Sequence, residues 1–73
     1  MGDQARALQE YARVLELYPN SRRAATALYK SGRIELERGN TDDARTYFNR
    51  VIQGYPGSDE VELARRELTR LDG

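Results

Sequence analysis

The chain has 73 residues, enough for one small domain, and it contains no Cys and no His, which excludes disulfide bonds and thiolate metal sites. Its 12 basic and 12 acidic residues balance, which argues against a nucleic-acid-binding protein, because such proteins carry a basic excess or stripe. No stretch approaches the roughly 20 apolar residues that a membrane-spanning helix needs, so we expect no membrane insertion.

The first predicted helix covers about residues 3–18. Pro19 ends it, because proline cannot continue a helix and disfavours helical geometry in the residue before it. Its apolar residues recur at spacings of three and four, as on one face of a helix: Ala7, Tyr11, Val14, Leu15 and Tyr18.

The second predicted helix covers about residues 21–38. Ser21 is expected to cap it by accepting a hydrogen bond from a free backbone N–H, and Gly39 to end it in the left-handed conformation. Gly32 lies in mid-helix, where glycine costs about 1 kcal/mol relative to alanine. We therefore expect a neighbouring helix to approach closely there, with Tyr47 or Phe48 filling the space.

The first turn of this second helix carries Arg22 and Arg23, whose positive charges oppose the helix dipole. The corresponding residues of the fourth helix are Asp59 and Glu60. Such a broken local rule indicates either contact with an acidic partner or a solvated pair that bridges to nearby acidic side chains. The mismatch between the two units also argues against an idealised repeat sequence.

The third predicted helix covers about residues 41–54 and begins at Asn40 or Thr41, and the fourth covers about 58–71, with Ser58 as its cap. Acidic clusters lie at both helix starts, where the helix dipole favours negative charge. We interpret them as structural and not as acid–base pairs or a calcium site. The sequence thus predicts no catalytic residue, no metal site and no cofactor.

The chain repeats itself after 37 residues, since "YPNS" at 18–21 returns as "YPGS" at 55–58. The same shift aligns Gly2 with Gly39, and it aligns Arg33 with Arg70. A period of 20–50 residues is typical of proteins built from stacked repeats, and each unit here consists of two helices.

These residues resemble the tetratricopeptide repeat family. The full repeat matches the family pattern at Leu28, Gly32, Gly39, Asn40, Ala44, Phe48 and Pro56, and the preceding half-repeat matches at Gly2, Asp3, Ala7, Tyr11 and Pro19. The chain departs from the pattern at Val14, Val51 and Glu35. The resemblance implies an all-α fold of four antiparallel helices stacked as a superhelix, ordered as a half repeat, a full repeat and a half repeat. It implies one domain over residues 1–73, which we expect to be a fragment of a longer protein.

The 37-residue period, with "YPxS" and "ALYxxG", looks like a bacterial subgroup of the family. That subgroup includes the cell-division coordinator of the Tol-Pal system and the lipoprotein of the outer-membrane β-barrel assembly machine. The likeness favours the bacterial periplasm or envelope over the cytoplasm.

The resemblance implies a non-catalytic module that binds proteins, with a groove lined by the first helix of each repeat. A partner peptide or helix would contact Thr26, Tyr29, Arg33, Leu36, Glu37, Leu63, Arg66 and Arg70. Two arginines beside a tyrosine suit an acidic segment of the partner, and the alternative is that they are ordinary surface charges.

A second hypothesis is an oligomerisation element that uses apolar end faces, with Leu8, Ala12 and Leu15 on an uncovered side of the first helix. It predicts self-association of the isolated chain. The alternative is a monomer with a few exposed leucines.

Overall fold

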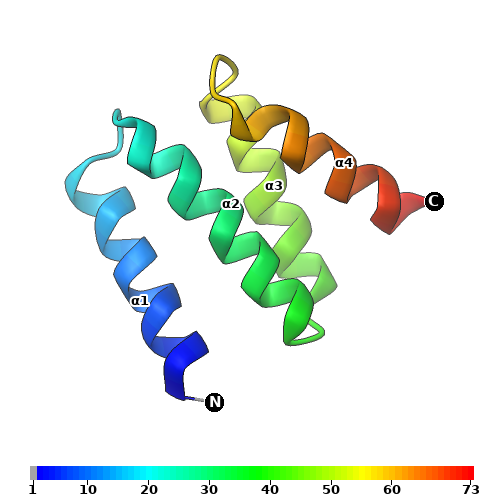
Figure 1. Cartoon of the computed structure of the whole chain (residues 1–73), viewed down its shortest axis with the longest axis horizontal. Helices are drawn as coiled ribbons and strands as arrows, with labels where there is room; N and C mark the ends of the chain where they lie inside the picture. Colours follow the sequence, from blue (N-terminus) through cyan, green and yellow to red (C-terminus); the bar gives the residue numbers. More distant parts are fainter. Residues whose placement is uncertain (1) are drawn as a thin grey trace.

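Residues 2–73, which the computed structural model describes, form four α-helices and no strand. The helices are α1 (Gly2–Leu17), α2 (Arg22–Glu37), α3 (Thr41–Gly54) and α4 (Glu60–Asp72). Consecutive helices run antiparallel and pack against one another, and α2 also touches α4 (Figure 1). The α1 and α4 helices lie on opposite sides of the central α2–α3 pair (Figure 1). The predicted all-α repeat-like fold is confirmed.

The two serines of the repeated turn behave differently from the predicted caps. The Ser21 hydroxyl donates to the Tyr18 carbonyl at 2.9 Å, and the Ser58 hydroxyl donates to the Tyr55 carbonyl at 2.8 Å. The backbone N–H of each serine bonds to the same carbonyl. The prediction that these side chains accept from the next helix is therefore wrong. Each serine instead satisfies the carbonyl of the tyrosine just past the preceding helix, which has no helical N–H partner because the helix ends there.

The turn between α2 and α3 has the predicted left-handed glycine, since Gly39 has a φ of 83°. The Asn40 N–H reaches back to the Glu35 carbonyl at 2.8 Å, which is the six-to-one bond of a Schellman motif. The Asn40 side chain also donates to the Glu35 carboxylate at 3.1 Å. Side chain and backbone together therefore fix the angle at which α3 leaves α2.

The core lies where α2 and α3 cross. A Cβ placed on Gly32 would lie 2.6 Å from Cε1 of Phe48, so the bare helix backbone makes room for the ring. The Phe48 side chain is fully buried, and its centroid lies 5.8 Å from that of Tyr29. The close approach predicted at Gly32 is confirmed, and the structure selects Phe48 over Tyr47. The core cluster comprises Leu28, Ala44, Phe48, Val51, Val61 and Ala64.

The α1 helix is packed less completely than its repeat counterpart α3. Ala44, Phe48 and Val51 of α3 are each 0% exposed, whereas none of the residues of α1 is fully buried. The reason is that α3 lies between α2 and α4, while α1 contacts α2 alone. One side of α1 is therefore uncovered.

Candidate functional site

The first helices of the two repeat units, α2 and α4, lie side by side and are joined by two polar contacts. The Thr26 hydroxyl donates to the Glu60 carboxylate at 2.7 Å. Further along, Nε of Arg33 lies 3.3 Å from Oε2 of Glu67. These contacts are seven residues apart on each helix, or two helical turns, so they keep α2 and α4 in register.

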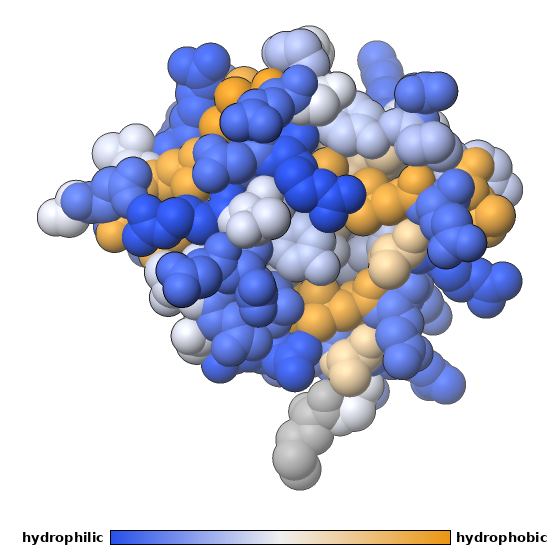
Figure 2. Space-filling view, turned by 180° about the vertical axis from the view of Figure 1, so that it is seen from behind, coloured by the Kyte–Doolittle hydropathy of each residue, from blue (hydrophilic) through white to orange (hydrophobic). Residues whose placement is uncertain are grey.

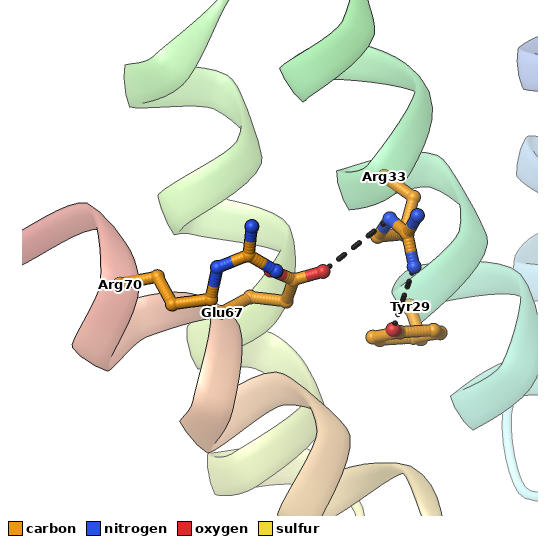
Figure 3. Close-up of polar contacts among 4 residues, drawn as sticks. All are labelled: Tyr29, Arg33, Glu67 and Arg70. Carbon is orange, nitrogen blue, oxygen red and sulfur yellow. Dashed lines mark hydrogen bonds and ion pairs between the residues drawn. The ribbon is translucent and has the colours of Figure 1, made fainter.

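Glu67 lies between two guanidinium groups, those of Arg33 and Arg70 (Figure 3). Only 7% of Glu67 is exposed, and its second oxygen lies 3.4 Å from Nη1 of Arg70. Arg33 also donates to the Tyr29 hydroxyl at 3.1 Å. This hydrogen bond, together with nearby negative charge including that of Glu67, raises the pKa of Arg33 above its ordinary value. The ion pairs thus satisfy a carboxylate that burial would otherwise destabilise.

The structure therefore brings Arg33 and Arg70 together, as the groove hypothesis requires, but around a carboxylate of the chain itself. Sequence reasoning missed Glu67. One signal was available. Glu67 lies three residues before Arg70, a spacing at which opposite charges on a helix are neighbours. The 37-residue shift also aligns Glu67 with Lys30, so the second unit has a negative charge where the first has a positive one. The Arg33 side chain is 50% exposed and the Arg70 side chain is 80% exposed, so their N–H donors that do not contact Glu67 are accessible to a partner.

The other predicted groove residues are spread over several environments. Leu36 is half-buried and packs against the core, and Glu37 accepts a hydrogen bond from Gln4 of α1 at 3.1 Å. Leu63 is 39% exposed, and Arg66 is exposed without an ion pair to any of residues 2–73. A shallow hollow of about 460 Å³ lies on α4 itself, lined by Glu62, Arg65, Arg66, Thr69 and Arg70.

The residues predicted for self-association do not share one environment. Leu15 is half-buried and packs against the core, Leu8 is half-buried, and Ala12 is exposed. The large apolar side chains that are most exposed are Leu17 at 58% and Tyr18 at 55%. Figure 2 shows hydrophobic surface along the side of the molecule where α1 lies.

The two "YPxS" turns contact each other directly, because the Tyr55 hydroxyl donates to the Pro19 carbonyl. The second turn therefore holds the first one through a backbone atom. A hollow of about 360 Å³ lies beside this contact, lined by residues that include Asn20, Ser21, Gly57 and Ser58.

Replacing Tyr55 with Phe is expected to lower the free energy of unfolding by about 0.5–1.5 kcal/mol, because the hydroxyl bond between the turns is lost. Tyr18→Phe is the matched control. This residue occupies the same place in the repeat but is exposed, so a change within about 0.5 kcal/mol is expected. Urea denaturation followed by circular dichroism measures both, and equal losses would contradict the assignment.

Between residues 2 and 73, no group of three or more Asp or Glu side chains is arranged so that it could hold a metal ion. None of the four helices is both long enough and apolar enough to cross a membrane.

Comparison with known proteins gives one match. A family model described as tetratricopeptide repeat matches residues 1–59, which include α1, α2, α3 and the second "YPxS" turn. Searches of curated proteins and of solved structures found no significant match.

Proposed function

Because the chain belongs to the tetratricopeptide repeat family, whose repeats generally mediate protein–protein interactions, we propose that it is a non-catalytic module whose groove binds a partner. The groove is the surface along α2 and α4, and its partner is an extended peptide or a helix with an acidic segment.

The observation that carries this proposal is the cluster of Arg33, Glu67 and Arg70. It holds α2 and α4 in register before any partner arrives, so binding costs little further conformational entropy of these helices. The cluster has two guanidinium groups for one carboxylate, and its outer donors face solvent. Arg66 adds a third exposed cation, and Leu63 adds an exposed apolar side chain. Acidic and apolar side chains of a peptide would match this surface.

The test is selection of peptides from a random-sequence library displayed on phage, with the chain immobilised. Selected peptides are expected to be acidic, and Arg66→Glu is expected to weaken their binding about tenfold, because attraction becomes repulsion. Arg50→Glu, an exposed arginine on α3, is the matched control and is expected to leave binding unchanged. If the selected peptides bind Arg66→Glu and Leu63→Ser variants as tightly as the original chain, the groove does not hold them.

We also propose that the chain belongs to the bacterial 37-residue-period subgroup and forms one domain, residues 1–73, of a longer periplasmic or envelope protein. Support comes from the two "YPxS" turns, which make the same serine-to-tyrosine bonds and contact each other through Tyr55. Residues that recur after 37 positions thus take part in the packing of one repeat unit on the next.

The alternative function is an oligomerisation element. It is favoured by the exposed Leu17 and Tyr18 and by the incomplete burial of α1. A mass in solution above that of one chain would support it.

A further inference from the structure

The seam along which α2 and α4 lie side by side carries opposite charges at its two ends. At the end beside the repeated turns, the Glu60 carboxylate accepts from the Thr26 hydroxyl at 2.7 Å and forms no ion pair within the described part of the chain. At the other end, Arg33 and Arg70 share a single carboxylate, that of Glu67 (Figure 3). We call these the negative end and the positive end of the seam.

The negative end borders the hollow of about 360 Å³ that lies beside the two turns. Buried Ala25 and half-buried Tyr55 supply apolar wall, while Glu60 and the exposed Asp59 supply carboxylates. Arg22 also lines the hollow, so two carboxylates stand against one guanidinium and negative charge is in excess. The volume is far more than one water molecule needs. Such a hollow suits a lysine or arginine, whose aliphatic stem packs on apolar wall while its charged head reaches a carboxylate.

The helix geometry fixes the separation of the two ends. Thr26 and Arg33 are seven residues apart on α2, and Glu60 and Glu67 are seven residues apart on α4. Seven residues are two helical turns, or about 10 Å. The same length corresponds to about three residues of an extended peptide or about seven of a helix. A partner segment that reaches both ends therefore needs a basic and an acidic side chain at this separation.

We propose that the groove holds its partner segment by two charges of opposite sign. A lysine or arginine of the segment enters the hollow and pairs with Glu60, and an aspartate or glutamate about 10 Å further along pairs with Arg33 and Arg70. Because each end of the seam attracts one sign of charge and repels the other, the segment lies in one direction only. This inference rests on the proposed function, binding along α2 and α4, and adds to it a basic anchor and a direction.

The test uses the peptides selected on the immobilised chain. Besides their acidic residue, they are expected to carry one lysine or arginine at a constant separation from it. Exchanging these two residues within a selected peptide keeps its composition and net charge but reverses its charge pattern. Fluorescence anisotropy is expected to show that the exchanged peptide binds about tenfold more weakly, because both ends of the seam then face a like charge.

A protein variant locates the basic anchor. Glu60→Gln removes the charge at the negative end but keeps a side-chain oxygen that can accept from Thr26. It is expected to weaken binding of the original peptide about fivefold, and to leave unchanged the binding of a peptide whose basic residue is replaced by alanine. Asp43→Asn, which removes an exposed carboxylate at the start of α3, is the matched control and should leave both peptides unaffected. Circular dichroism confirms that each variant is folded.

Three results would overturn this inference: acidic peptides selected without a basic residue at a constant separation, an exchanged peptide that binds as tightly as the original, or equal effects of Glu60→Gln and Asp43→Asn. Each of these leaves the proposed function standing. A selection that yields no acidic peptides, or peptides that Arg66→Glu and Leu63→Ser do not affect, overturns the proposed function and this inference with it.

Discussion

Replacing Phe48 with Ala is expected to lower the free energy of unfolding by about 3–5 kcal/mol, the usual cost of emptying a fully buried aromatic site. The ring is 0% exposed, packs over Gly32 and contacts Tyr29, so no solvent can enter to relieve the cavity. A domain of 73 residues has a total stability of roughly 4–11 kcal/mol. The variant should therefore lose a large part of the stability of the domain, which urea denaturation followed by circular dichroism measures.

Tyr11→Ala is the matched control, because Tyr11 occupies the same place in the repeat and is only half-buried. Its loss is expected to cost about 1–2 kcal/mol, in proportion to the smaller apolar area that it removes from water. Equal costs at the two positions would mean that α1 is as fully packed as α3 and would contradict the incomplete burial of α1.

Replacing Gly32 with Ala is expected to lower the free energy of unfolding by about 1–3 kcal/mol, although alanine is the better helix former by about 1 kcal/mol. The added Cβ would lie 2.6 Å from Cε1 of Phe48, and the ring is enclosed by the core and has little room to move. Gly54→Ala in α3 is the control. Nothing lies within 4 Å of its Cβ position, so this change should be neutral or slightly stabilising.

A double-mutant cycle tests the cause of the Gly32 effect. In a Phe48→Leu background the side chain at position 48 is smaller, so Gly32→Ala should cost at least about 1 kcal/mol less than in the original chain. Strict additivity of the two changes would show that the glycine is needed for another reason.

Helix positions and turns could largely be predicted from the sequence, because their causes act within a few residues. The spacing of apolar residues, the two prolines and the left-handed Gly39 all work through the local backbone. The 37-residue period then indicated stacked helix pairs, since neither helix of a pair can bury its apolar face alone. The requirement for a close neighbour at Gly32 followed from helix propensity, which is also local.

Only the tertiary structure decided which side chains meet. Phe48 rather than Tyr47 fills the space at Gly32, because the Phe48 side of α3 faces α2 there. Glu67 lies buried between Arg33 and Arg70, where the sequence indicated a groove with two free arginines. Ser21 and Ser58 close the preceding helix rather than cap the next. Each of these outcomes depends on contacts between residues far apart in the chain or on competition between two nearby bonding partners. Local propensity indicated that a helix approaches Gly32, but it does not say which side chains of the neighbouring helices face each other. Those facing pairs determine which charges are buried and how completely α1 is covered.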